Sequence, residues 1–273
     1  MPRKSSGAIR VGIGGWVFQP WRGTFYPKGL AQKRELEFAS RALTSIEING
    51  TYYGSQKPES FRRWHDETPD GFVFSVKGPR FATSRRVLAE AGPTIERFFK
   101  SGVLELQDKL GPINWQMLPT KKFDAEDFDA FLALLPKSVA GRALRHVVEV
   151  RHDSFRTPEF IALLRRHGVG VVLTDNEAYP RIADVTAPFV YARLQCASED
   201  EAAGYAPKTL DLWVKRATEW SRGGQPAGVD RVAGAEKKAP KARDVFVYVI
   251  NGFKPKAPTA AMALIERLNA EQR

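Results

Sequence analysis

Cysteine, histidine and long apolar runs are all scarce in this chain of 273 residues. Cys196 is the only cysteine, which excludes a disulfide within the chain and is typical of a protein in a reducing compartment. The 4 histidines are too few and too scattered to indicate a multi-zinc hydrolase. No stretch has the length and apolar character of a signal peptide or a membrane span. We therefore expect a cytoplasmic protein without a membrane partner.

Positive charge, in contrast, is in excess, with a formal net charge of +11. Such a surplus attracts anionic partners at long range but specifies neither a fold nor a reaction. Much of it lies in residues 221–243, which are rich in Gly, Ala, Pro and Lys without apolar periodicity, so we predict a flexible basic insertion there. A solvated surface segment is the favoured interpretation; the alternative is a nucleic-acid contact through Lys237, Lys238, Lys241 and Arg243.

Eight short apolar runs recur from one end of the chain to the other, and each ends with polar residues. They cover residues 11–16, 45–49, 72–77, 113–118, 146–151, 169–175, 189–193 and 245–251. A repeat of strand, helix and strand that occurs eight times predicts that neighbouring strands pair in parallel through right-handed crossovers. The predicted fold class is therefore α/β, a TIM-type (β/α)8 barrel. Residues 1–8 would form a short basic tail and residues 9–273 a single barrel domain that contains the insertion.

Amphipathic stretches between these runs predict the helices. We expect them over residues 30–42, 59–67, 94–110, 125–135, 157–168, 207–220 and 258–268. Asp124 and Thr157 are suitable N-caps, Pro158 suits a first turn, and Gly168 suits a helix end. The basic insertion then follows the helix over 207–220. Since helix-to-strand connections open away from the barrel mouth, we expect the insertion to lie far from the chemistry.

Polar residues at the ends of the runs point to a site at the barrel mouth. Strand side chains alternate between two faces, and the carboxyl ends of parallel barrel strands meet at one opening. The candidate catalytic residues there are Glu47 and Glu149, which would share acid/base work, Lys77, which would hold or neutralise an anion, and Asp175, which would position it. The candidate substrate-binding residues are Arg151 and Arg193 for an anion, Asn49, Gln116 and Asn251 for hydroxyl groups, and Trp16 as an apolar wall.

Each of these assignments has a structural alternative. Glu47 with Lys77, or Glu149 with Arg151, can be buried ion pairs that only hold the strands. Trp16 can belong to the core, and Lys77 can pair a charge rather than act as a nucleophile. Burying so many polar groups costs several kcal/mol unless they are paired or solvated, which favours an accessible polar cavity.

The chain has residues that could form a metal site, but it lacks a dinucleotide-binding motif. Glu47, Glu149 and Asp175 with His152 would form an oxygen-rich set for Mg²⁺ or Mn²⁺, although the strand alternation places His152 on the opposite face. The glycines at 12–15 lack the helix start and the downstream acid of a dinucleotide fingerprint. We therefore predict no cofactor and assign no metal ligand, and a divalent metal remains the alternative.

Several motifs together resemble a known family. They are Gly-Ile-Gly-Gly-Trp at 12–16, Ile-Glu-Ile-Asn-Gly-Thr-Tyr-Tyr at 46–53, Phe-Ser-Val-Lys-Gly-Pro at 74–79, Leu-Gly-Pro-Ile-Asn-Trp-Gln at 110–116, Val-Glu-Val-Arg-His-Asp-Ser-Phe at 148–155 and Tyr-Ala-Arg-Leu at 191–194. In order and spacing the chain resembles the YecE-like proteins, domain of unknown function 72. The resemblance implies a TIM-like barrel and no particular reaction. Gln195 and Cys196 depart from the His-Gly pair usual in that family, which puts a shared substrate in doubt.

From these observations we expect a small-molecule enzyme, a hydrolase, lyase or isomerase, acting on a sugar-like or anionic substrate in the mouth. The alternative is a non-catalytic protein that binds nucleic acid or a phosphorylated metabolite through its basic surface. Neither the reaction nor the oligomeric state follows from the sequence.

Overall fold

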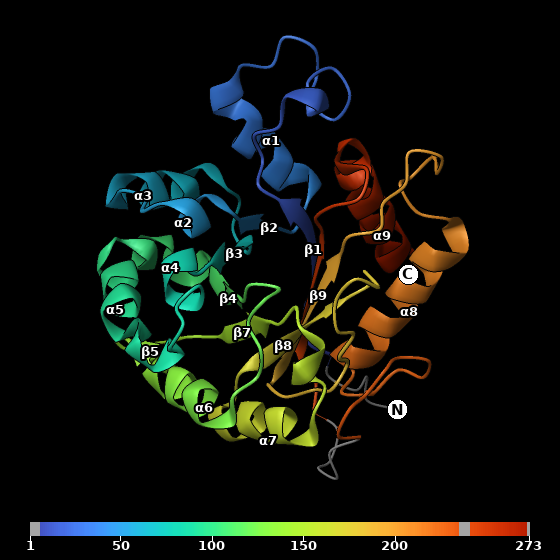
Figure 1. Cartoon of the computed structure of the whole chain (residues 1–273). Helices are drawn as coiled ribbons and strands as arrows, with labels where there is room; N and C mark the ends of the chain where they lie inside the picture. Colours follow the sequence, from blue (N-terminus) through green and yellow to red (C-terminus); the bar gives the residue numbers. More distant parts are fainter. Residues whose placement is uncertain (1–5, 235–240, 272–273) are drawn as a thin grey trace.

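The computed structural model describes residues 6–234 and 241–271. Eight strands close into a barrel in which all neighbouring strands are parallel (Figure 1). They are β1 (Ile9–Gly14), β2 (Ser45–Ile48), β3 (Val73–Lys77), β4 (Leu110–Gln116), β7 (His146–Glu149), β8 (Gly170–Thr174), β9 (Phe189–Leu194) and β10 (Asp244–Val249). The predicted TIM-type barrel is confirmed.

Helices surround the barrel on its outside (Figure 1). They are α1 (Glu35–Ala42), α2 (Gly50–Tyr53), α3 (Pro58–Glu67), α4 (Arg80–Thr83), α5 (Gly92–Lys100), α6 (Ala125–Leu134), α7 (Pro158–His167), α8 (Pro207–Ser221) and α9 (Ala257–Glu271). A small antiparallel pair, β5 (Ser138–Val139) and β6 (Arg142–Ala143), lies in the connection from α6 to β7.

Local signals set several helix ends where the sequence predicted them. The carboxylate of Asp124 accepts the Asp127 amide at 3.0 Å at the start of α6, and the Thr157 hydroxyl accepts the Phe160 amide at 3.2 Å at the start of α7. Gly168 ends α7 at a φ of 69°. The helix predicted over 94–110 is shorter, because Gly102 has a φ of 100° and interrupts it.

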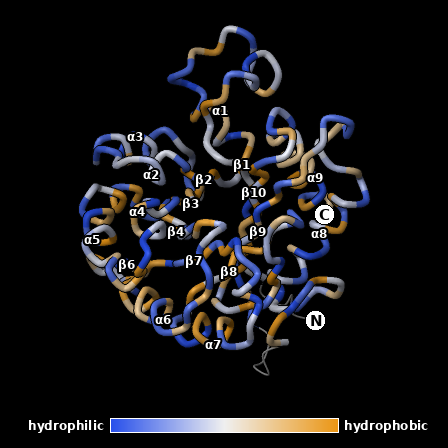
Figure 2. The backbone as a smooth tube through the Cα atoms, viewed as in Figure 1, coloured by the Kyte–Doolittle hydropathy of each residue, from blue (hydrophilic) through white to orange (hydrophobic). Residues whose placement is uncertain are grey.

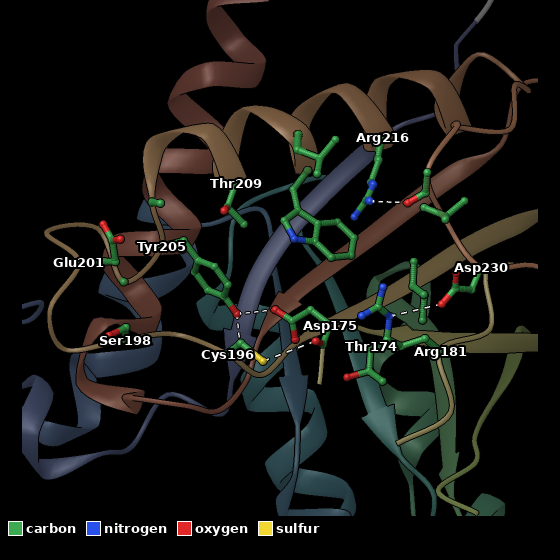
Figure 3. A pocket seen from close by; sticks show the side chains of 17 residues that line it. Thr174, Asp175, Arg181, Cys196, Ser198, Glu201, Tyr205, Thr209, Arg216 and Asp230 are labelled. Carbon is green, nitrogen blue, oxygen red and sulfur yellow. Dashed lines mark hydrogen bonds and ion pairs between the residues drawn. The ribbon is translucent and has the colours of Figure 1, made fainter. Parts of the chain in front are cut away.

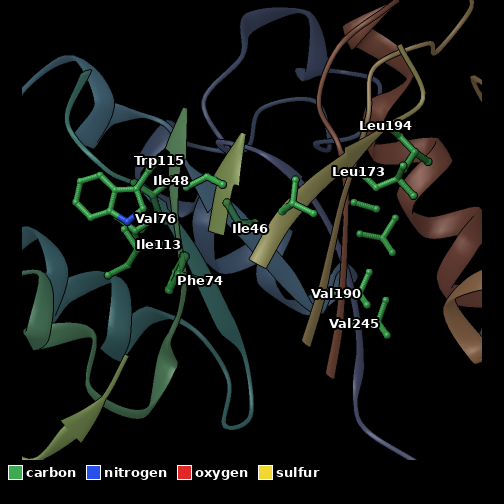
Figure 4. Packing of buried hydrophobic residues seen from close by; sticks show 14 of the residues in the cluster. Ile46, Ile48, Phe74, Val76, Ile113, Trp115, Leu173, Val190, Leu194 and Val245 are labelled. Atoms are coloured by element: carbon green, nitrogen blue, oxygen red, sulfur yellow. The ribbon is translucent and has the colours of Figure 1, made fainter. Parts of the chain in front are cut away.

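The outward faces of the strands pack against the helices and form the main core. Figure 2 shows apolar residues concentrated where helices and barrel meet. Figure 4 shows outward-facing strand residues in this layer, among them Ile46, Val76, Leu173, Leu194 and Val245. Alternating apolar residues therefore bury one face of each strand and leave the other face for the barrel interior.

The barrel interior changes in polarity from its N-terminal to its C-terminal end. Val147, Val172, Phe189 and Phe246 belong to an apolar cluster inside the barrel. One strand step further along, hydroxyl groups pair across the interior: Ser45 with Tyr248 and Ser75 with Tyr191, both at 2.7 Å. Charged residues follow at the C-terminal ends. The interior apolar cluster therefore fills the barrel on the N-terminal side of the polar residues.

One strand-to-strand connection departs from the predicted alternation. Residues 175–188, between β8 and β9, contain no helix. Part of the basic insertion packs against this connection: Ala183 donates its amide to the Asp230 carbonyl at 2.7 Å, and Asp184 accepts the amides of Val232 and Ala233 at 2.6 and 3.0 Å. The repeat of eight helices was therefore wrong at this position.

The insertion is only partly covered by the described residues. Lys237 and Lys238, which carried the predicted nucleic-acid contact, lie outside them, as do residues 1–5 of the predicted tail. Gly7 and Ala8 are bonded to the barrel, through the Ser221 carbonyl at 2.9 Å and the Asp244 carboxylate at 3.0 Å. Arg243 donates to the Gly223 carbonyl at 2.8 Å, within the same connection. The described part of the insertion is thus packed onto the barrel.

Candidate functional site

Two carboxylates and one guanidinium form the centre of the polar end of the barrel. Arg193 of β9 donates to Glu47 of β2 at 3.0 Å and also to Glu149 of β7. Tyr191, two residues before Arg193, donates its hydroxyl to Glu47 at 2.6 Å. All four side chains are buried. Strand alternation therefore does bring residues 47, 149 and 193 together, as the sequence predicted.

Glu149 binds a second arginine closer to the opening. Arg151 donates two hydrogen bonds to one oxygen of Glu149, at 2.7 and 3.0 Å. Burial acts to raise the pKa of Glu149, but Arg193, Lys77 and Arg151 together lower it to about 2. Glu149 is therefore ionised at neutral pH. The side chain of Arg151 remains 17% exposed, and its guanidinium lies 4.6 Å from the ring centre of Tyr179.

Lys77 has a different environment from the two arginines. Its ammonium group donates to the Gln116 side chain and lies 5.0 Å from the ring centre of Tyr52. Among the described residues no carboxylate lies within ion-pair distance of it. Burial and the nearby Arg193 lower the pKa of Lys77 to about 8. Lys77 is thus a buried amine that can exchange a proton near neutral pH.

Asn114, Tyr191 and Tyr52 belong to this cluster although the sequence analysis did not single them out. The Asn114 amide lies 3.3 Å from Glu47 and 3.4 Å from Glu149, and its side-chain oxygen is buried without a partner in the described structure. Strand phase could have found Asn114 and Tyr191, since they lie two residues from Gln116 and Arg193. Tyr52 follows β2 on α2, where strand phase no longer applies.

Asp175 does not lie in the mouth, contrary to prediction. On β8 the residues facing inward are Val172 and Thr174, so Asp175 continues the outward face with Leu173. Its carboxylate accepts the Gln195 amide at 2.6 Å and the Tyr205 hydroxyl at 2.8 Å, outside the barrel. Burial raises the pKa of Asp175. Asp175 thus lies on the outward face of the strand, whereas Glu47 and Glu149 face the barrel interior.

Trp16 and Asn251 are also placed differently from the prediction. Strand β1 ends at Gly14, and Gly15 turns the chain at a φ of 71°. Trp16 therefore packs edge-on against Trp64 of α3, with ring centres 5.1 Å apart, as the core alternative proposed. After β10, Ile250 packs on the interior cluster and Asn251 is exposed.

Asn49 remains near the opening at the end of β2. It is partly buried, and a Cβ on Gly14 would come within 2.8 Å of its amide nitrogen. Gly12 likewise permits close approach, because a Cβ there would lie 1.9 Å from the Ser45 carbonyl oxygen. Glycine on β1 thus provides space beside the amide of Asn49.

The residues considered for a divalent metal do not form a ligand set in the described structure. The described residues include no group of three or more His, Cys, Asp or Glu side chains arranged to hold a metal ion. Asp175 faces away from Glu47 and Glu149, and the Nδ1 atom of His152 lies 2.9 Å from the Ser154 hydroxyl. The four residues considered for Mg²⁺ or Mn²⁺ are therefore not brought together.

Comparison with known sequences places the chain in a family. The family model "Protein of unknown function DUF72" matches residues 10–273. The chain belongs to the DUF72 family. Among curated relatives, UPF0759 protein YecE of Escherichia coli O157:H7 is 28% identical over 173 residues, which cover 62% of this chain and 59% of that protein. The chain thus matches less than two thirds of that relative's length. The predicted resemblance to YecE-like proteins is confirmed.

Two solved DUF72 structures are similar over almost the whole chain. The protein TM1631 of Thermotoga maritima MSB8 has a TM-score of 0.74 at 23% identity, covering 96% of this chain and 99% of that one. The protein EF0366 of Enterococcus faecalis V583 has a TM-score of 0.70 at 17% identity, covering 97% and 99%. At these identities the likeness shows the DUF72 fold alone. In the described part of the chain, no helix has the length and apolar character needed to cross a membrane.

Proposed function

We propose that this protein is a small-molecule enzyme, a hydrolase, lyase or isomerase, whose site is the polar mouth of the barrel and whose substrate is sugar-like and anionic. The observation that carries the proposal is a surplus of buried positive charge. Lys77, Arg151 and Arg193 surround only two carboxylates, Glu47 and Glu149. A buried cation without a counter-ion is costly, so a bound anion would stabilise the cluster.

Arg151 is the group best suited to meet such an anion. It is the most exposed of the three cations, and its contacts with Glu149 and Tyr179 hold its guanidinium in a defined orientation. A guanidinium binds carboxylate and phosphate in forked geometry. Arg193 is fully engaged by Glu47 and Glu149 and would instead orient these two carboxylates. The substrate would therefore enter past Arg151.

Lys77 is the candidate for proton transfer. General acid/base catalysis is most effective when the pKa of the group lies near the working pH, and the pKa of Lys77 is about 8. Glu149, with a pKa of about 2, would stay charged and stabilise a developing positive charge. Gln116, Asn114 and Asn49 would orient hydroxyl groups near Lys77. Lys77 would thus do the acid/base work that we expected Glu47 and Glu149 to share.

The proposal is tested by thermal unfolding with glucose 6-phosphate as the anionic probe and glucose as the neutral one. We expect glucose 6-phosphate to raise the melting temperature of the wild type, and Arg151→Gln to weaken this binding about tenfold, because a charge-assisted contact is lost. Arg97→Gln, an exposed arginine on α5, is the matched control and should behave as the wild type.

Two results would contradict the proposal. One is equal stabilisation of Arg151→Gln and the wild type. The other is no stabilisation by any sugar acid or sugar phosphate, together with nucleic-acid binding that falls steeply with salt. The second result would favour a binding protein for nucleic acid instead.

A further inference from the structure

A cavity lies outside the barrel, beside the connection that lacks a helix. Its volume is about 430 Å³, which is within the usual range for small-molecule sites. Five segments line it: the end of β8, the connection from β8 to β9, the loop after β9, helix α8 and residues 228–230 of the insertion (Figure 3). The insertion was expected to lie away from the strand ends, and the missing helix explains why it instead reaches Thr174 and Asp175. The mouth residues Glu47, Glu149 and Lys77 do not line this cavity.

Two arginines face this cavity from different walls. Arg216 of α8 donates to the Gly228 carbonyl at 2.9 Å, and its guanidinium lies 5.1 Å from the ring centre of Trp213. Arg181, from the connection between β8 and β9, lies 3.7 Å from Asp230 (Figure 3). Burial and the charge of Arg181 lower the pKa of Arg216, so the two cations are close enough to repel each other.

The polar atoms of Arg216 are incompletely satisfied. Its Nε atom is buried without a hydrogen-bond partner in the described structure. A buried donor without a partner costs about 1–3 kcal/mol, and more for a charged group. An anionic oxygen placed between the terminal nitrogens of Arg216 and Arg181 would screen the repulsion between the two guanidinium groups. Arg181 already lies 3.5 Å from Glu177 and 3.7 Å from Asp230, whereas no carboxylate of the described residues lies within ion-pair distance of Arg216.

The other acids of the cavity do not oppose an anion at this end. The carboxylate of Asp175 is occupied by the Gln195 amide and the Tyr205 hydroxyl, and burial raises its pKa. Glu201 lies with Ser198 at the opposite end of the cavity from the arginines (Figure 3). The cavity is thus polarised, with cations at one end and hydrogen-bonding groups at the other.

We propose that this cavity binds a small hydroxylated molecule carrying a phosphate or carboxylate group. The anionic group would lie between Arg181 and Arg216, which supply forked donors. Hydroxyl groups of the ligand would reach Thr209, Ser198 and Glu201 at the other end. The site is separate from the barrel mouth and does not depend on the function proposed for it.

Cys196 provides a direct test, because this exposed residue lines the cavity and is the only cysteine of the chain. Its thiol is alkylated with iodoacetamide at mildly alkaline pH, since burial and Asp175 raise its pKa to about 11. We expect millimolar glucose 6-phosphate to slow this alkylation in the wild type and glucose to have no effect. In Arg216→Gln the concentration required for protection should rise about tenfold.

Two controls separate this site from general effects and from the mouth. Lys215→Gln removes an exposed charge from the neighbouring position of α8 and should keep the protection of Cys196. Arg151→Gln, which alters the mouth, should keep it too. The proposal is overturned if glucose 6-phosphate leaves the alkylation rate unchanged, if glucose protects equally, or if Arg216→Gln is protected at the same concentration as the wild type.

Discussion

Burial determines the charge state of individual residues in this protein. His146 is an example outside the candidate site: its Nδ1 atom accepts the Trp115 indole at 3.1 Å, and its Nε2 atom lies 2.8 Å from the Pro136 carbonyl oxygen. Burial lowers the pKa of His146 to about 4. The ring is therefore neutral at neutral pH, with both nitrogens used in the core. This histidine has a structural role, consistent with its position at the start of β7.

His146 should make the protein sensitive to mild acid. Its pKa is about 4 when folded and near 6.5 when unfolded, so the unfolded chain binds more protons between these values. The free energy of unfolding should therefore fall as the pH drops from about 6.5 to about 5, by roughly 1 kcal/mol per pH unit for this one group. Urea unfolding at several pH values measures the slope. In His146→Gln this part of the slope should vanish, and an unchanged slope would contradict the prediction.

At the scale of elements, capping residues close in sequence determine where helix α7 begins and ends, whereas a backbone turn determines where strand β1 ends. Thr157, Pro158 and Gly168 set both ends of α7 where the sequence predicted them, because capping involves residues only a few positions apart. Strand β1 instead ends at Gly14, because the positive φ of Gly15 turns the chain and takes Trp16 out of the strand alternation. Residues just beyond a strand are therefore hard to place from alternation alone.

The cap of α7 gives a quantitative test. Thr157→Ala removes the hydroxyl that accepts the Phe160 amide, so the protein should lose about 1 kcal/mol of unfolding free energy. Thr157→Ser keeps an equivalent oxygen and should retain most of the stability. Urea unfolding of both variants measures the difference, and equal midpoints for alanine and serine would exclude a capping contribution.

At the scale of the whole molecule, the irregular connection between β8 and β9 couples distant segments. Asp184 in this connection is buried and holds two amides of the insertion, while Arg165 of α7 donates to the Gly234 carbonyl at 3.1 Å. These contacts join parts of the chain that are 48 or more residues apart. Residues 228–230, just before these contacts in the chain, line the cavity beside α8.

Release of this tether should expose the insertion to proteases. Asp184→Asn removes the charge from the acceptor of the Val232 and Ala233 amides, which costs about 1.5 kcal/mol and raises the open population about tenfold. Trypsin should then cleave after Arg231 about tenfold faster. Asp70→Asn, at an exposed position, is the control. If both variants are cleaved at the wild-type rate, Asp184 does not hold the segment.

The sequence by itself determined the barrel and the centre of the mouth. A period of two along each strand, with eight carboxyl ends at one opening, was sufficient to place Glu47, Glu149, Lys77 and Arg193 together. Only the tertiary structure decided the rest. It showed that Asp175 continues an outward face, that Tyr191 reaches Glu47 across the barrel, and that an absent helix leaves a cavity filled in part by the insertion. These features depend on contacts between residues far apart in the chain, which local patterns do not encode.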